Sequence, residues 1–154
     1  MPIRWRWYRW EELDPDTLYG FLKLRSDIFV VEQNCVFSDL DDRDRCCEHL
    51  CGRDRDGQIG AYARLMPPGV KADAPMIGRV VVRQQLRATG LGRTLMQEAL
   101  RRCTEQYPQS PVLLSGQQHL ERFYASLGFA TIGEPYLEDG IWHVDMRREA
   151  ILGA

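Results

Sequence analysis

Two glycines separated by one residue, Gly90 and Gly92, follow an apolar stretch at 76–83 and precede a helical pattern. The first amide groups of a helix lack partners within the helix, and the helix dipole favours an anion beside them. Glycine has no Cβ, so the backbone can approach a ligand closely at these positions. The segment 84–95 therefore predicts a binding site for a phosphate or pyrophosphate.

Three phosphate-binding motifs can be compared with this segment. A Walker loop requires GxxxxGK[ST], but Gly92-Arg93-Thr94 has Arg in place of Lys and no glycine at the required offset. A dinucleotide-binding GxGxxG requires a third glycine where Leu95 stands and an acid about 20 residues further on, and both are missing. The remaining pattern is Arg-x-x-Gly-x-Gly, formed by Arg87, Gly90 and Gly92.

This pattern resembles the acetyl-CoA loop of the GNAT N-acetyltransferase superfamily. A second motif, Phe123-Tyr124-Ala125-Ser126-Leu127-Gly128-Phe129, is similar to the FYxxxGF signature of that superfamily and lies about 30 residues after the glycine loop. Similarity to the ElaA-like branch covers nearly the whole chain. It is carried by the start of the chain and by the segments 24–35, 61–64, 77–80 and 138–143.

The resemblance implies that acetyl-CoA is the acyl donor and that no metal is needed. The pantetheine arm would lie in a wedge between two splayed central strands, around 80–82 and 112–115. Arg83 and Arg122 could reach the outer phosphate of CoA. The cofactor-binding residues implied are Val80, Val81, Val82, Arg87, Ala88, Thr89, Gly90, Leu91, Gly92, Arg93, Gln117 and Tyr124.

Acyl transfer from a thioester requires a neutral amine, a stabilised oxyanion and a proton donor for the leaving thiolate. The resemblance makes Tyr124 the proton donor. On a continuous helix Gln117 would share the face of Tyr124, whereas His119 would lie roughly 140° away around the axis. The oxyanion donor is expected to be a backbone N–H of the strand that ends near Val82.

The general base is harder to assign, because the strand 79–83 has no carboxylate, which many GNAT enzymes carry there. Glu32 is the first candidate, since the first helices of this fold line the acceptor side. His143 and His49 follow. Each of these three could equally be a solvated or structurally paired polar group.

The elements that must position these residues can be predicted from the pattern of the chain. Ile3, Trp5 and Trp7 alternate with polar neighbours, which indicates a strand with one buried face. A helix is capped by Asp14, and further helices are predicted from Leu91 and over about 118–127. In the strand at 58–65, alternate residues should face opposite sides, with one face formed by Ile59, Ala61, Ala63 and Leu65.

The predicted order is β-α-β-β-β-α-β-α-β-β, which describes a single α/β or α+β domain over 1–154 with a mostly antiparallel, mixed sheet. The resemblance adds helices on both faces of that sheet.

The composition excludes several other classes. A net charge of −2 argues against sequence-independent nucleic-acid binding, although 18 of the 20 basic residues are Arg. No stretch approaches the ~20 apolar residues of a membrane helix, and the first ten residues lack the apolar core of a secretion signal, so we expect a cytoplasmic protein with no membrane contact. The odd number of cysteines, five, favours a reducing compartment. Cys46, Cys47, His49 and Cys51 lack the second ligand pair of a structural zinc site.

The resemblance implies an acetyl-CoA-dependent N-acetyltransferase that acts on the primary amine of a small acceptor. Six acids are expected to be solvated, but they could also give the acceptor entrance a negative field that favours a cationic acceptor. They are Glu32, Asp39, Asp41, Asp42, Glu138 and Asp139. An acyl-homoserine-lactone synthase-like enzyme is compatible with the spacing of Arg25 and Phe29. A non-catalytic acyl-CoA sensor is suggested by the missing strand carboxylate. A homodimer is possible by analogy with the superfamily.

Overall fold

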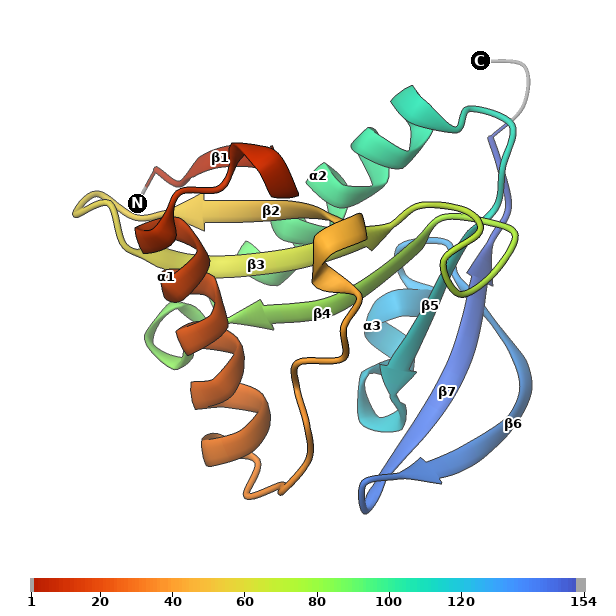
Figure 1. Cartoon of the computed structure of the whole chain (residues 1–154). Coiled ribbons are helices and arrows are strands. Elements are labelled where there is room, and N and C mark those ends of the chain that lie inside the picture. The colour runs from red at the N-terminus through yellow and green to blue at the C-terminus, as the bar shows by residue number, and fades with distance from the viewer. Residues whose placement is uncertain (1, 152–154) are drawn as a thin grey trace.

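A seven-stranded sheet forms the centre of the structure, with helices on both of its faces (Figure 1). The computed structural model describes residues 2–151, so Met1 and 152–154 of the predicted domain lie outside the described residues. The strands are β1 (Arg4–Arg9), β2 (Glu48–Arg53), β3 (Ile59–Met66), β4 (Met76–Val82), β5 (Val112–Gln117), β6 (Ala130–Glu138) and β7 (Ile141–Arg148). The helices are α1 (Pro15–Arg25), α2 (Leu91–Gln106) and α3 (Glu121–Ala125), with a π-helical segment η2 (Ser26–Glu32) and the 3-10 turns η1 (Trp10–Glu12), η3 (Asp44–Cys46), η4 (Gln84–Leu86) and η5 (Gln118–Leu120).

The sheet order is β1-β2-β3-β4-β5-β7-β6, and only the β4–β5 pair is parallel. The predicted α/β or α+β fold with a mostly antiparallel sheet is therefore confirmed. No helix within 2–151 is long and apolar enough to cross a membrane.

Two hydrophobic cores lie on the two faces of the sheet because β3 alternates between them. Ala61, Ala63 and Leu65 pack with Leu95 of α2, while Tyr62 packs with Phe21 of α1 on the other face. This arrangement agrees with the predicted alternation at three of its four apolar positions. Ile59 is the exception, since a register shift at Gly52/Arg53 turns its side chain to the α1 core.

The first helix does not end as a regular α-helix. Asp14 caps it by accepting a hydrogen bond from the Thr17 amide at 2.8 Å, and Pro15 occupies the first turn. After Arg25 the chain continues as the π-helical segment η2 up to Glu32. Such wider turns are rare and often occur at functional sites. Here the segment brings Phe29 and Glu32 to the edge of the cleft described below.

The parallel pair β4–β5 separates soon after it forms. Its register contains only Met76 with Leu113 and Ile77 with Leu114, whereas β5 pairs with β7 along its whole length on the other edge (Figure 1). Between Tyr62 and Arg64 the β3–β4 register also shifts, and Arg79 has a φ of +50° on the bulged side. The predicted wedge between splayed central strands is thus present.

The predicted helix over about 118–127 is shorter than expected. The segment starts as the 3-10 turn η5, and α3 covers only Glu121–Ala125. Gln117 is the last residue of β5, so the expectation that it shares a helix face with Tyr124 is wrong. The motif around Gly128 closes the helix, because Gly128 has a φ of +98° that favours glycine.

Candidate active site

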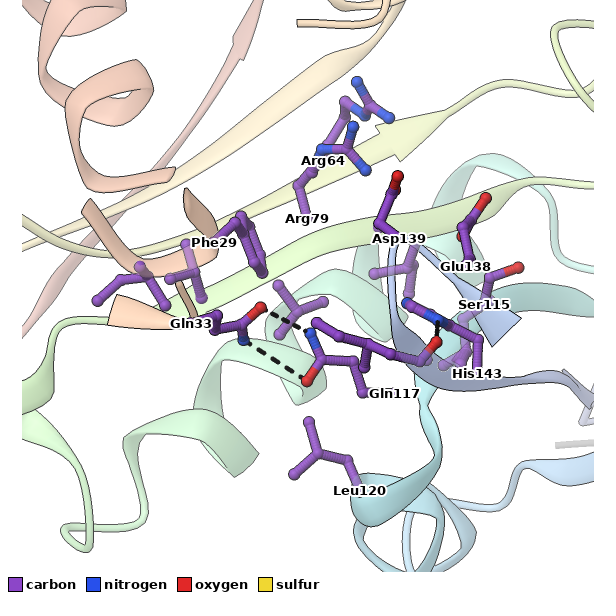
Figure 2. A pocket seen from close by; sticks show the side chains of 18 of the residues that line it. Phe29, Gln33, Arg64, Arg79, Ser115, Gln117, Leu120, Glu138, Asp139 and His143 are labelled. Atoms are coloured by element: carbon purple, nitrogen blue, oxygen red, sulfur yellow. Dashed lines mark hydrogen bonds between the residues drawn. The ribbon is translucent and has the colours of Figure 1, made fainter. Parts of the chain in front are cut away.

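A cleft of about 690 Å³ opens where β4 and β5 separate (Figure 2). Its walls come from η2, the segment after it, β4, the end of β5, α3 and the β6–β7 turn. Seven residues predicted from the sequence line it together: Glu32, Val80, Val81, Val82, Gln117, Tyr124 and His143. Arg87 and Gly92 line the cleft as well.

The glycine loop lies beside this cleft and presents unused backbone donors. Gly90 stands before α2 with a φ of +82°, a conformation that favours glycine. Within the described chain, the amide groups of the segment 88–93 have no hydrogen-bond acceptor. Such a row of free amides at a helix start suits an anion, and it fits the diphosphate of CoA. Ala88, Thr89, Gly90, Leu91 and Arg93 belong to this row but lie outside the cleft lining.

The arginines predicted to bind phosphate differ in whether their guanidinium groups already have partners. Arg93 donates to the Ser126 hydroxyl at 2.6 Å and lies over the Phe123 ring, on α3. Arg83 pairs with Asp54 at 2.8 Å, which holds it at the β2–β3 turn. Arg122 is exposed on α3. Arg83 could therefore contact the outer phosphate only by breaking its ion pair with Asp54.

Glu32 and Arg87, predicted for two different roles, form one ion pair across the cleft entrance. The Arg87 guanidinium donates to both carboxylate oxygens of Glu32, at 2.7 and 3.0 Å, and its Nε donates to the Val82 carbonyl at 3.1 Å. The two side chains come from η2 and from the loop before α2, which are 55 residues apart. A phosphate that attracts Arg87 would compete with Glu32 for the same guanidinium.

Tyr124 is almost completely buried and faces the cleft from α3. Its ring packs on the backbone of Gly116 and edge-on against Phe123 and Phe129. Burial raises the pKa of its phenol to about 12. Its hydroxyl has no hydrogen-bond partner among the residues that the structure describes, so it can donate to a ligand in the cleft.

Gln117 lines the cleft together with Gln33, a residue that no sequence motif singled out. Its side-chain amide exchanges two hydrogen bonds with that of Gln33, at 3.1 and 3.5 Å (Figure 2). This pair joins the end of β5 to the segment after η2. Because each amide satisfies the other, either could be displaced by the amide groups of a bound ligand.

The three histidines have different surroundings. His143 lines the cleft, stacks on Tyr136 and bonds through Nδ1 to the Ile141 carbonyl at 2.8 Å, which leaves Nε2 for a substrate. His119 lines the cleft from η5. His49 is completely buried and has partners at both ring nitrogens, the Tyr62 hydroxyl and the Asp44 carbonyl. An acceptor cannot reach His49, so His49 is unsuitable as a general base.

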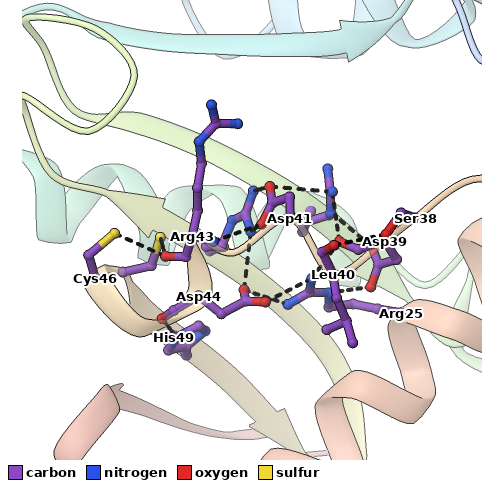
Figure 3. Close-up of polar contacts among 12 residues, drawn as sticks. Arg25, Ser38, Asp39, Leu40, Asp41, Arg43, Asp44, Cys46 and His49 are labelled. Carbon is purple, nitrogen blue, oxygen red and sulfur yellow. Dashed lines mark hydrogen bonds and ion pairs between the residues drawn. The ribbon is translucent and has the colours of Figure 1, made fainter.

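The acidic segment after η2 is part of a buried ion-pair network rather than a solvated loop (Figure 3). Arg25, fully buried, donates to Asp39 at 2.9 Å and to Asp44 at 2.8 Å. Arg64 donates to Asp41 through both guanidinium nitrogens at 2.8 Å. Although burial alone would raise it, the Arg64 guanidinium holds the pKa of Asp41 well below its usual range.

This network changes the expected electrostatics of the acceptor entrance. Asp39 and Asp41 are neutralised by arginines, and Glu32 is paired with Arg87. Of the six predicted acids, only Glu138 and Asp139 both line the cleft and lack a cationic partner within residues 2–151. The sequence did contain one signal for the network, because Arg25 follows Leu18, Phe21 and Leu22 on the apolar side of a helix.

The cysteines take no part in the cleft's polar wall, apart from Cys35 at its edge. Burial raises the pKa of the Cys47 and Cys51 thiols to about 12, which makes them unreactive. Cys46 and Cys47 both donate to the Arg43 carbonyl. Within residues 2–151 no group of three or more His, Cys, Asp or Glu is arranged to hold a metal ion.

Comparison with known proteins identifies the family. A family profile described as an acetyltransferase (GNAT) domain matches residues 48–150. The ElaA protein of Escherichia coli is 41% identical over 151 residues, which is 97% of this chain and 98% of that protein. This chain belongs to the GNAT acetyltransferase family. The similarity to its ElaA-like branch is confirmed over nearly the full length.

Solved structures of GNAT relatives agree with this assignment. An acyl-CoA N-acyltransferase from Pseudomonas aeruginosa has a TM-score of 0.91 and 40% identity, covering 96% of this chain and 99% of that one. The crystal structure of Escherichia coli ElaA has a TM-score of 0.90 and 40% identity, covering 96% and 100%. The GNAT N-acyltransferase fold is therefore established, and with it an acyl-CoA acyltransferase family.

A more distant likeness concerns the fold alone. The CoA-dependent acyl-homoserine lactone synthase BjaI has a TM-score of 0.80 at 19% identity, covering 98% of this chain and 85% of that one. Arg25 and Phe29, whose spacing made the synthase class compatible with the sequence, lie in different surroundings in this structure. Arg25 is fully buried in the ion-pair network, whereas Phe29 lines the cleft.

Proposed function

We propose that this chain is an acetyl-CoA-dependent N-acetyltransferase that transfers the acetyl group to the primary amine of a small, cationic acceptor. The observation that carries the proposal is the position of Tyr124, whose ring is buried and whose hydroxyl has no partner in residues 2–151, in the same cleft that the splayed β4–β5 pair opens. A free row of amides at 88–93 lies at one end of that cleft. These features fit a long thioester whose diphosphate and reacting carbon are far apart.

The binding residues follow from this fit. The amides of the segment 88–93 and the Arg87 guanidinium would hold the diphosphate. The edge of β4 beyond Ile77 has no strand partner on the β5 side, so its backbone groups at 78–82 can pair with the amides of the pantetheine arm. Acetyl-CoA supplies the activated acyl group when bound, and no protein group needs to become acylated.

The side chains of the cleft then divide the proton transfers between them. The amine must lose one proton to attack, and Glu32 or His143 would accept it. A backbone N–H on the bulged part of β4, where Arg79 has a positive φ, would stabilise the oxyanion. The leaving thiolate would receive a hydrogen bond from Tyr124. When the tetrahedral intermediate collapses, the C–S bond breaks and the nitrogen loses a second proton, which ends on the CoA thiolate, so the products are an amide and a free thiol.

The acceptor's ammonium group would be attracted by Glu138 and Asp139 at the β6–β7 turn (Figure 2). These two carboxylates are exposed, so their attraction acts mainly on the approach of the acceptor and weakens with salt. This is a smaller negative field than the six predicted acids would have given, because arginines pair with Glu32, Asp39 and Asp41, and Asp42 does not line the cleft.

An amine panel with thiol detection of released CoA tests the proposal. We expect acetyl-CoA to bind in calorimetry and at least one class of primary amine to release CoA above the hydrolysis background. Absence of acetyl-CoA binding at millimolar concentration would overturn the proposal. Binding without turnover over a broad amine panel would favour a non-catalytic sensor, and lactone formed from S-adenosylmethionine and an acyl donor would favour a synthase.

A further inference from the structure

The side chain of Arg43 is the exception among the half-buried arginines around the cleft. Its guanidinium forms no hydrogen bond and no ion pair with any residue in 2–151, although it lines the cleft. Figure 3 shows it extending away from the ion-pair network that surrounds its own backbone. A partly desolvated guanidinium without a counterion is costly unless a ligand supplies one.

The two network acids on either side of Arg43 are already paired with other arginines. Asp41 pairs with Arg64 and lies within 3.5 Å of Arg79, and Asp44 pairs with Arg25 and Arg64. The Arg43 backbone is fixed as well, because its amide donates to Asp41 and its carbonyl accepts from two cysteine thiols. The network thus fixes the Arg43 backbone and leaves its guanidinium without a partner in residues 2–151.

The pairing of the other cations in the cleft sets Arg43 apart. Of the cationic side chains that line it, Arg64 and Arg79 pair with the network aspartates Asp39, Asp41 and Asp44, and Arg87 pairs with Glu32. Lys71 is exposed and also has no carboxylate partner within 2–151. An acceptor that is cationic throughout would leave the Arg43 end of the cleft without a counterion.

We propose that the acceptor carries a carboxylate, which binds the Arg43 guanidinium with Lys71 at the rim, in addition to the amine that is acetylated. A single guanidinium matches one carboxylate in bidentate geometry. The carboxylate would complement the Arg43 and Lys71 cations, while Glu138 and Asp139 attract the ammonium group before it loses its proton. The inference rests on the proposed N-acetyltransferase function and makes its acceptor an amino acid, which is cationic only at the ammonium group.

The cleft also indicates what separates the two polar ends of that acceptor. Phe37, Met66 and Met76 also line the cleft, and Phe37 lies under the Arg79 guanidinium at 5.8 Å. These side chains offer an apolar wall rather than further polar contacts. Amino acids with an apolar body between or beside the two groups are therefore the first candidates.

The experiment compares ω-amino acids and apolar α-amino acids with the corresponding amines that lack the carboxyl group, by CoA release. The ω-amino acids matter because their amines have nearly the same basicity as those of the comparison compounds. We expect kcat/KM to be about tenfold or more higher for the carboxylates, as for loss of one hydrogen-bonded charge pair. Arg43→Gln should remove this preference by raising KM for the carboxylates only.

Arg45→Gln is the matched control, because Arg45 is exposed, lies over Trp10 and does not line the cleft. It should leave the preference unchanged. Equal turnover of both compound classes, or an equal loss for both classes in Arg43→Gln, would overturn the inference while leaving the acetyltransferase intact. Turnover of none of the amines would count against the proposed function itself.

If none of the amines is turned over, a binding measurement still tests whether the cleft recognises a carboxylate. Calorimetry of an N-acetylated amino acid and of its carboxamide, each with CoA present, requires no catalysis. A preference for the carboxylate of about tenfold that Arg43→Gln abolishes would support the inference. The same affinity for both compounds in the wild-type chain would overturn it.

Discussion

At the scale of single residues, the proton on Tyr124 determines what this side chain can do. With a pKa of about 12 the phenol stays protonated at any ordinary assay pH, so it acts as a donor and never as a base. A thiol has an ordinary pKa of about 8.5, so complete transfer of the phenol's proton to the CoA thiolate would be unfavourable. In the proposed mechanism Tyr124 would therefore stabilise the leaving sulfur mainly by donating a hydrogen bond.

Tyr124→Phe tests this role directly. The ring packing on Gly116 and Phe129 is retained, and only the hydroxyl is lost. We expect kcat to fall by about 10- to 100-fold, at the low end for proton-donating groups, with the acetyl-CoA Kd changed less than about twofold. Steady-state kinetics and calorimetry measure the two quantities. An unchanged kcat would remove Tyr124 from the mechanism.

The Glu32–Arg87 pair makes a second prediction at this scale, because the two residues have opposite expected effects. Arg87→Ala removes the proposed diphosphate ligand and should weaken acetyl-CoA binding about tenfold. Glu32→Gln removes the competing carboxylate, so acetyl-CoA should bind no more weakly, whereas kcat should fall about tenfold or more if Glu32 is the base.

Arg4→Ala is the control for this pair, since Arg4 is exposed on the edge strand β1, and it should alter neither quantity. If Glu32→Gln binds acetyl-CoA as before and keeps its full kcat, the base must be sought at His143.

At the scale of elements, the contact between β5 and α3 fixes the direction of the Tyr124 ring. A Cβ at Gly116 would lie 2.8 Å from Tyr124 Cε2 and 3.2 Å from Leu114 Cδ1. Gly116→Ala should therefore push the phenol out of place, lowering stability by about 1–3 kcal/mol and lowering kcat as well. Chemical denaturation and steady-state kinetics measure the two effects.

Gly78→Ala provides the comparison for stability, because a Cβ there meets nothing within 4 Å. It should show no overpacking. If Gly116→Ala kept both wild-type stability and kcat, the close packing of β5 against α3 would not be what positions the phenol.

The elements also show where sequence patterns stop being informative. The glycine loop, the helix after it and the strand alternation of β3 follow from local residue types, and all were predictable. The π-helical segment η2 has no comparable local signal, because it repeats apolar residues much as an α-helix does. The side of the sheet taken by Ile59 depends on a bulge whose cause lies in the pairing with β2.

The candidate site was predictable to a similar extent. Its backbone donors and Tyr124 belong to continuous motifs, so the sequence placed them. Pairs such as Gln33 with Gln117, which are 84 residues apart, form only when the chain is folded. The same is true of the bonds from Arg25 to Asp39 and Asp44, which changed the expected charge of the acceptor entrance.

At the scale of the whole molecule, the buried polar network joins α1, the segment before β2 and the centre of the sheet. His49 on β2 belongs to it and is neutral: its Nε2–H donates to the Asp44 carbonyl at 2.8 Å, and its Nδ1 accepts from the Tyr62 hydroxyl at 2.6 Å. The assignment of the ring proton follows from these partners. The ring also stacks on Phe21, so a charge on it would be poorly solvated.

This environment makes global stability depend on pH in two ranges. Burial lowers the pKa of His49 below its ordinary 6.5, so below that pH the unfolded chain binds a proton that the folded chain does not. Stability is then fully present above about pH 6.5 and decreases as the pH falls, by up to about 1.4 kcal/mol per pH unit for this one proton. The pKa values of Asp41 and Asp44 are lowered by their arginines, which adds a second loss below about pH 4.

Denaturant unfolding at several pH values, for the wild-type chain and for His49→Gln, separates the first range from the second. The variant loses ring packing on Phe21, so it should be less stable at pH 7.5. Because it lacks the proton that only the unfolded chain takes up, the difference between the two proteins should shrink steadily from pH 6.5 to pH 5. Below about pH 4 both should lose stability together, since the aspartates of the network are present in both. Parallel stability curves between pH 6.5 and pH 5 would show that His49 is not what links folding to pH in that range.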